Sequence, residues 1–167
     1  MASTARKCLQ LSGKLVGRIG AYSAILYCTA HCITEYALDF TKCTGPSMQP
    51  TIENNDIVLT EHISTKFFNK VDKGDVVVLR SPVDPKQFLC KRVVGMEFDE
   101  VPVNRWKFLR TKNVPKGHIW IEGDNRTNST DSREFGPVPL AMVRGRAVLR
   151  VWPWERRGYL APHPASR

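Results

Sequence analysis

The sequence is short of the residues that build metal centres and disulfide scaffolds. Five cysteines in 167 residues are too few for a disulfide-rich fold, and the odd count leaves at least one unpaired within the chain. The four histidines form no H-x3-H or H-E-x-x-H pair, and the C-x3-C spacing of Cys28 and Cys32 has no second pair to complete a zinc ribbon. We therefore expect neither a metal site nor a cofactor.

Internal repeats at a fixed period are also lacking. Eleven glycines and eleven prolines exclude a coiled coil or a simple helical bundle, and a hydrophobic content of 42% excludes a disordered chain. The net charge of +9 is compatible with nucleic acid, an anionic membrane or a solvated surface. Because no zinc finger or RNA-binding aromatic pair lies among the basic residues, we expect a basic surface and a basic membrane flank, and no nucleic-acid partner.

The N-terminal segment is basic and has no acidic residue before Glu35. Residues 19–34 carry no formal charge, and as a helix they would reach about 24 Å, against about 30 Å for a bilayer core. If Arg18 snorkels, the segment 15–36 predicts a short transmembrane anchor behind a basic segment, 1–14, with the rest of the chain across the membrane. A removable targeting peptide and an ordinary buried helix are the alternatives.

After residue 36, short apolar runs alternate with turn sequences. The runs are rich in Val, Ile, Leu and aromatic residues, and Asn, Asp, Gly and Pro separate them. This pattern predicts a mainly β domain over 37–153, a folded sheet or barrel, followed by a loosely ordered tail, 154–167. The expected strands are 56–60, 75–80, 88–95, 118–122 and 142–152, with one helical turn around 62–69.

One segment, 123–136, breaks the strand pattern with the sequence GDNRTNSTDSREFG. It contains no aliphatic residue, and its acidic and basic side chains are nearly balanced in number. Polar loops of this kind are common on surfaces, but balanced charges over such a length favour an internally hydrogen-bonded network.

Two residues are candidates for nucleophilic chemistry. Ser47 lies among Gly45, Pro46 and Pro50, which prevent a helix and present the serine on an irregular backbone, although such turns are common. Lys91 lies in an apolar strand, where burial would lower the pKa of its amine and allow it to act as a base. The alternative is an edge strand on which the aliphatic part of the lysine lies along the surface.

Four segments in chain order resemble the motifs of the signal peptidase I family, which are membrane-bound Ser-Lys endopeptidases. The resemblance spans about residues 20–153 and implies a signal-peptidase-like β-sheet or barrel domain behind one N-terminal transmembrane helix. The matching segments are 47–51 (SMQPT), 73–77 (KGDVV), 91–95 (KRVVG) and 123–133 (GDNRTNSTDSR).

The resemblance implies a role for each matching residue. Ser47 would attack the scissile carbonyl, and a neutral Lys91 would take its proton. The backbone N–H of Ser47 would donate to the oxyanion, whereas Gly45 stands where some bacterial members have a serine as second donor. The implied supporting residues are Ser129, which orients the lysine, Asp131 and Arg133 as an ion pair, and Asp124, with Met48 as a substrate-binding residue.

Within this family the chain is most similar to the mitochondrial members, through residues 45–48, 81–85 and 128–133. That similarity implies removal of sorting presequences from precursor proteins directed to the intermembrane space. It also implies a single-pass inner-membrane protein whose catalytic domain faces that space, in a hetero-oligomeric complex with a homologous second catalytic subunit. Two consecutive glycosylation sequons, 125–127 and 128–130, lie in the segment assigned to the active site, which agrees with a compartment that does not glycosylate.

Several alternatives remain open at this point. A self-cleaving Ser-Lys repressor would need a DNA-binding helix-turn-helix before residue 40, and a non-catalytic anchored scaffold would be expected to lack a member of the dyad. Cys43 and Cys90 each lie near a proposed catalytic residue, either as a disulfide or as two buried free thiols.

Overall fold

The computed structural model describes the backbone of residues 2–68, 70–103 and 111–160, and side chains from Val16 onward. Contacts within the chain divide it into two units, Met1–Ala37 and Leu38–Arg167. We describe each unit by itself.

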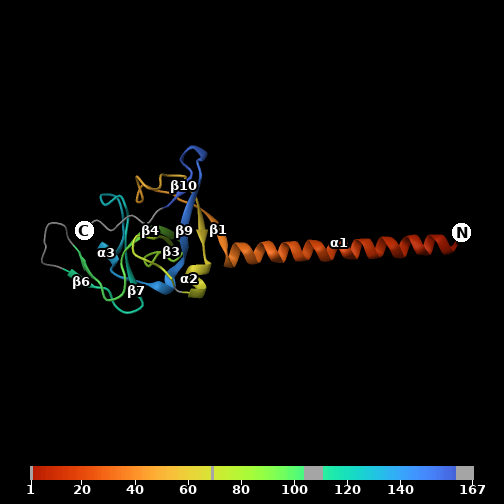
Figure 1. Ribbon diagram of the computed structural model, residues 1–167, viewed down its shortest axis with the longest axis horizontal. Coiled ribbons are helices and arrows are strands. Elements are labelled where there is room, and N and C mark those ends of the chain that lie inside the picture. The colour runs from red at the N-terminus through yellow and green to blue at the C-terminus, as the bar shows by residue number, and fades with distance from the viewer. Residues whose placement is uncertain (1, 69, 104–110, 161–167) are drawn as a thin grey trace. The chain divides into compact units, whose positions relative to one another are not determined.

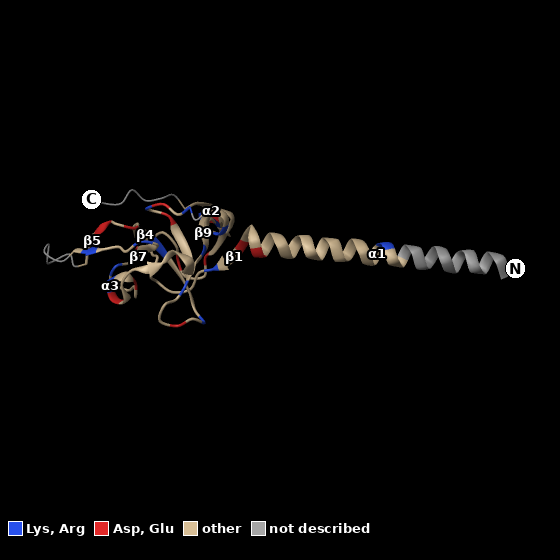
Figure 2. Ribbon diagram, turned by 90° about the horizontal axis from the view of Figure 1, so that it is seen from below, with Lys and Arg blue, Asp and Glu red and all other residues tan. Residues whose placement is uncertain are grey.

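The first unit is a single helix, α1 (Ala2–Tyr36), which runs through the expected boundary between residues 14 and 15. The segment contains no proline that would end it earlier. In Figure 2 the stretch between Arg18 and Glu35 carries no charged side chain, and apolar residues such as Ile25 and Leu26 are exposed. Within the described part of the chain, no helix has both the length and the apolar character that crossing a membrane requires.

The second unit is built on an antiparallel sheet with strand order β1-β2-β9-β3-β4-β7-β8, in which β10 also pairs with β9 (Figure 1). Strands β5 and β6 form a separate hairpin. The elements in chain order are β1 (Leu38–Lys42), β2 (Ile57–Glu61), α2 (Ile63–Phe68), β3 (Val76–Arg80), β4 (Phe88–Gly95), β5 (Glu100–Pro102), β6 (Thr111–Asn113), β7 (His118–Glu122), α3 (Ser132–Phe135), β8 (Val138–Pro139), β9 (Val143–Trp152) and β10 (Gly158–Tyr159), with 3-10 turns at Leu140–Met142 and Trp154–Arg156.

Strand β3 lies at the centre of the core, and its alternate side chains enter two apolar clusters. Val76 and Val78 pack with Met48 and Ile52 in one cluster. Val77 and Leu79 belong to the other cluster, which includes residues of β4, β7 and β8. Burial on both faces explains why this strand reads as a continuous apolar run rather than as an alternating one.

The mainly β prediction is confirmed, and β2, β3, β4, β7 and β9 coincide with the five expected strands to within a residue. The helical turn is α2, although residue 69 lies outside the described residues. The expectation of a loosely ordered tail is wrong for residues 154–160, because Gly158 and Tyr159 pair with β9 and Leu160 N–H donates to the carbonyl of Val148. Residues 161–167 lie outside the described part.

Candidate active site

Ser47 sits on a turn whose neighbours are anchored on both sides. Gly45 has φ +97°, a conformation that favours glycine, and its N–H donates to Asn54 Oδ1 at 3.0 Å. Met48 and Ile52 are buried in the core and are linked by a backbone hydrogen bond of 2.9 Å. Ser47 itself stays half-buried. The turn therefore presents the hydroxyl on a fixed backbone, as nucleophilic chemistry requires.

Lys91 lies on β4, which pairs with β3 on one side and β7 on the other. The side chain is not on an edge strand, so the surface alternative considered from the sequence is wrong. Lys91 is only 3% exposed. Burial lowers the pKa of its amine, and the nearby Asp131 carboxylate opposes that shift only in part. Burial thus shifts the amine toward the neutral form that a general base needs.

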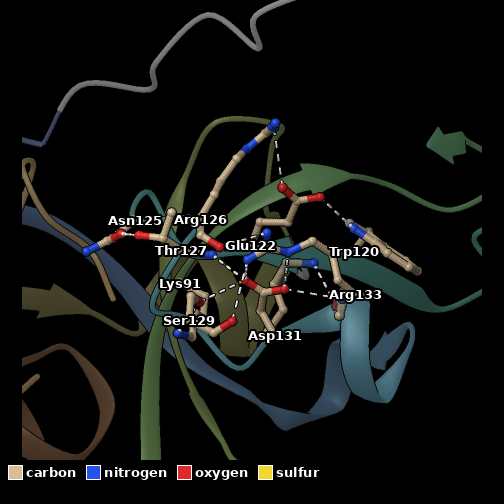
Figure 3. A network of polar contacts seen from close by, with 12 residues as sticks. Lys91, Trp120, Glu122, Asn125, Arg126, Thr127, Ser129, Asp131 and Arg133 are labelled. Atoms are coloured by element: carbon tan, nitrogen blue, oxygen red, sulfur yellow. Dashed lines mark hydrogen bonds and ion pairs between the residues drawn. The ribbon is translucent and has the colours of Figure 1, made fainter. Parts of the chain in front are cut away.

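A short chain of hydrogen bonds orients the Lys91 amine (Figure 3). Lys91 Nζ donates to Ser129 Oγ at 2.9 Å, and Ser129 Oγ donates to Asp131 Oδ2 at 2.7 Å. Because an ionised carboxylate can only accept, the single proton of the Ser129 hydroxyl points to Asp131, and its oxygen accepts from the lysine. The lone pair of the neutral amine is therefore left available for another proton donor.

Asp131 is the fixed end of this chain and is fully buried. It accepts from Gly123 N–H at 2.9 Å, and Arg133 binds both carboxylate oxygens at 2.8 Å. Burial alone would raise the pKa of this carboxyl, but the hydrogen bonds from Arg133, Gly123 and Ser129 hold it below its ordinary value. Asp131 also accepts from the backbone N–H of Arg133 and so caps α3.

The polar segment 123–136 brings the serine turn to the base. Asn125 N–H donates to the carbonyl of Ser47 at 3.0 Å, and its side-chain amide donates to the carbonyl of Pro46 at 3.1 Å. A Cβ on Gly123 would collide both with the carbonyl of Ser47 and with the side chain of Ser129. Gly123 therefore lies between the turn that carries the nucleophile and the group that orients the base.

Ser47 and Lys91 open into one pocket between the serine turn and β4. Met48, which is 3% exposed, also contributes to its wall, and the substrate-binding role expected for it stays a prediction. The lining residues are Thr41, Lys42, Cys43, Thr44, Gly45, Ser47, Met48, Ile52, Val78, Phe88, Leu89, Cys90 and Lys91.

Asp124 holds the framework of the site by pairing with Arg92. Arg92 Nε and Nη2 donate to the two oxygens of Asp124 at 2.8 and 2.7 Å, and Nη1 donates to the carbonyl of Gly74 at 2.7 Å. This buried, bidentate contact ties β4 to the end of β7 and to the turn before β3. The sequence analysis assigned no role to Arg92, Gly123 or Asn125, although all three lie inside the matching motifs.

Other polar contacts extend the network in the same loop. Glu122 accepts from Trp120 Nε1 at 3.1 Å and pairs with Arg126 at 3.4 Å, and Thr127 donates to the side chain of Asn125 at 2.8 Å (Figure 3). Across residues 2–68, 70–103 and 111–160, no group of three or more His, Cys, Asp or Glu side chains is placed to hold a metal ion.

Comparison with known proteins identifies the family of the chain. The family described as signal peptidase, peptidase S26, matches residues 17–108 and 103–152. The chain therefore belongs to the signal peptidase family, a class of serine proteases.

Its relatives include mitochondrial proteins of closely similar length. Mitochondrial inner membrane protease subunit 1 of Xenopus tropicalis is 47% identical over 160 residues, which cover 95% of either chain. The human protein of the same name is 44% identical over 149 residues, covering 88% of this chain and 89% of its own. Mitochondrial inner membrane protease subunit 2 of Saccharomyces cerevisiae is 36% identical over 135 residues, covering 75% of either chain.

Replacing Ser129 with alanine removes the hydroxyl that orients the Lys91 amine. We expect kcat for peptide cleavage to fall by about 10²-fold to 10³-fold with little change in KM, because the lost contact is to the base. Steady-state kinetics of Ser129→Ala test this. The control is Thr130→Ala, because Thr130 is an exposed neighbour in the same loop. An unchanged kcat in Ser129→Ala would exclude the orienting role.

Proposed function

We propose that this chain is a signal-peptidase-type endopeptidase of the mitochondrial inner membrane that uses Ser47 as nucleophile and Lys91 as general base. The observation that carries this proposal is the buried Lys91 amine, held by Ser129 and Asp131 at the pocket that Ser47 also lines. The names of the relatives support the mitochondrial setting.

The proposed reaction starts with proton transfer from the Ser47 hydroxyl to the neutral Lys91 amine. The serine oxygen attacks the scissile carbonyl, and the Ser47 N–H donates to the developing oxyanion, a contact worth about 3 kcal/mol in other enzymes. The Lys91 ammonium then protonates the leaving amine, which leaves an acyl-enzyme. Lys91 next takes a proton from the water that attacks the acyl-enzyme and returns it to Ser47 Oγ as the carboxylic acid product leaves, which restores the serine and the neutral amine.

The second oxyanion donor differs from that of the bacterial members with a serine at this position. Gly45 has no side chain to offer, and its N–H already donates to Asn54 Oδ1. Thr44 is exposed and lines the pocket. We propose that the Thr44 hydroxyl supplies this donor when substrate is bound.

We also propose that α1 anchors the protein in the inner membrane, with its basic end in the matrix and the β unit in the intermembrane space. The helix carries exposed apolar side chains, including Val16, Ile19 and Leu26, which lipid would cover. The basic residues before residue 35 agree with the matrix side under the positive-inside rule. Precursors with sorting presequences are the proposed substrates, and a homologous second subunit is the proposed partner, as the subunit names of the relatives suggest.

The other two readings of the sequence fit these observations less well. A self-cleaving repressor would need a helix-turn-helix before residue 40, where the structure has the single helix α1. A non-catalytic scaffold would not need a desolvated lysine joined to Ser129 and Asp131. The endopeptidase accounts for both features.

The direct test uses the full chain co-expressed with its partner subunit and solubilised from the membrane in detergent. The nucleophile of the partner is replaced by alanine, so that any remaining cleavage belongs to this chain. We expect processing of a presequence-bearing precursor, with the new N-terminus identified by sequencing. If only complexes with an intact partner nucleophile process precursors, the proposed activity does not belong to this subunit.

The rate of cleavage is expected to depend on pH through Lys91. Because burial lowers the pKa of this amine, kcat/KM should rise with pH with a midpoint clearly below the ordinary lysine value of about 10.4. Initial rates between about pH 5 and 10 measure the midpoint, with unfolding monitored at each pH. A midpoint at the ordinary lysine value would contradict a desolvated base.

A further inference from the structure

Two cysteine side chains form part of the pocket wall beside the dyad. Cys43 belongs to the buried cluster of Met48, Ile52 and Val78, and Cys90 packs against that cluster. Both line the pocket and both are free thiols. Oxidation would join them through an S–S bond of about 2.05 Å.

The backbone holds each cysteine on a different side of the pocket. Cys90 is opposite Val78 in the pairing of β4 with β3 and directly precedes Lys91. Cys43 exchanges hydrogen bonds with the Asn55–Asp56 turn, at 2.9 Å to Asn55 N–H and 2.8 Å to the Asp56 carbonyl. A bond between the two sulfurs would therefore tie the strand of the base to the segment of the nucleophile.

The two thiols are not equivalent in acidity. The neighbouring Cys90 thiol lowers the pKa of Cys43, and the same interaction, together with burial, raises the pKa of Cys90. Because the thiolate is the reactive form in disulfide exchange, Cys43 is the better first nucleophile and Cys90 is the resolving thiol.

We propose that Cys43 and Cys90 form a reversible disulfide that changes the pocket and slows peptide cleavage; the effect on cleavage rests on the proposed function. The oxidant is a small disulfide such as oxidised glutathione. The Cys43 thiolate attacks one of its sulfurs and releases one glutathione thiolate. Cys90 then loses its proton and attacks the Cys43 sulfur, which releases the second. The protein loses two protons and two electrons, and the oxidant becomes two thiols.

The closed bridge would fix the gap between the serine turn and β4, where the substrate must enter. A displacement of about 1 Å from productive geometry can cost about 10²-fold in rate. We expect kcat/KM to fall by about 10-fold to 10²-fold in the oxidised protein and to recover on reduction.

The test uses the full chain with its partner subunit, whose nucleophile and cysteines have been removed. The other cysteines of this chain, Cys8, Cys28 and Cys32, are replaced by serine, which leaves only the pair. The protein is equilibrated in reduced and oxidised glutathione, free thiols are alkylated, and peptides are mapped by mass. We expect a cross-link between the Cys43 and Cys90 peptides in the oxidised buffer. A Cys90→Ser chain should give no such cross-link, and glutathione released by reduction should come from Cys43.

The outcomes separate the two proposals. No Cys43–Cys90 cross-link in the oxidised buffer overturns the disulfide site, whatever the activity. If the cross-link forms and kcat/KM does not change, the proposed effect of the disulfide on cleavage is wrong. The same conclusion follows if the oxidant lowers kcat/KM of the Cys90→Ser chain to an equal extent. A reduced protein that forms the cross-link on oxidation but never cleaves a precursor supports the disulfide site and counts against the proposed endopeptidase.

Discussion

Replacing Lys91 with methionine is expected to lower kcat/KM for precursor cleavage by about 10⁴-fold to 10⁶-fold while leaving the fold intact. Lys91 is the buried amine of the pocket that Ser47 also lines, and methionine keeps a similar length without accepting a proton. Cleavage by the detergent-solubilised complex, with the partner subunit inactivated, measures the loss. The Lys112→Met variant, which changes an exposed lysine on β6, should retain the normal rate.

The same substitution should raise thermal stability. Burial lowers the folded-state pKa of Lys91, so between that pKa and the unfolded value the unfolded chain binds more proton than the folded one. The contribution of this group to folding stability therefore grows as pH rises through the lowered pKa and levels off near the unfolded value of about 10.4. Methionine removes the desolvation cost, so Lys91→Met should melt at or above the wild-type temperature near pH 7. If Lys91→Met misfolds, its loss of activity says nothing about the base. The Lys91→Leu variant would then be the decisive test.

Replacing Ser47 with alanine is expected to abolish cleavage to a similar extent and to preserve substrate binding. The hydroxyl is the proposed attacking group, whereas the pocket walls that hold the peptide come largely from Met48, Ile52 and β4. The alanine variant should therefore bind an uncleaved precursor with near-normal affinity, as measured by co-purification of full-length precursor.

Two controls sharpen the Ser47 result. The Ser64→Ala variant changes a serine on α2, outside the site, and should cleave normally. A covalent serine-directed reagent should label wild-type protein at Ser47 and should do so poorly in Lys91→Met, because the serine then lacks its base. Residual cleavage by Ser47→Ala at more than about one-hundredth of the wild-type rate would assign the nucleophile to another residue.

The strands were predictable because their signals are local. Apolar runs bounded by Gly, Pro, Asn and Asp identify β2, β3, β4, β7 and β9 without knowledge of the rest of the chain. Strand β1, the hairpin β5–β6 and the short strands β8 and β10 were missed. In β5, β6, β8 and β10, two or three paired residues carry no usable period. The tail was misjudged for a related reason: its order comes from pairing with β9, which no local pattern records.

The site was predictable only as a set of motifs. On local sequence Ser47 looked like an ordinary turn residue and Lys91 like an edge-strand residue, and it was the order of four matching segments that singled them out. Their catalytic roles stay predictions. The functions of Arg92 and Asn125 could not be derived, because they depend on contacts with Asp124 and Ser47 that only the folded chain creates.

The single carboxylate of Asp131 both stabilises the loop and orients the hydrogen bonds that reach Lys91. It caps α3, receives the Gly123 N–H and fixes the proton of the Ser129 hydroxyl. Its contribution to stability is present above the unfolded aspartate value of about 3.9 and is lost only as pH falls through its lowered folded-state pKa. As pH falls, protonation of Lys91 should therefore abolish cleavage well before protonation of Asp131 destabilises the loop. A sample inactivated by mild acid should regain full activity when it is neutralised.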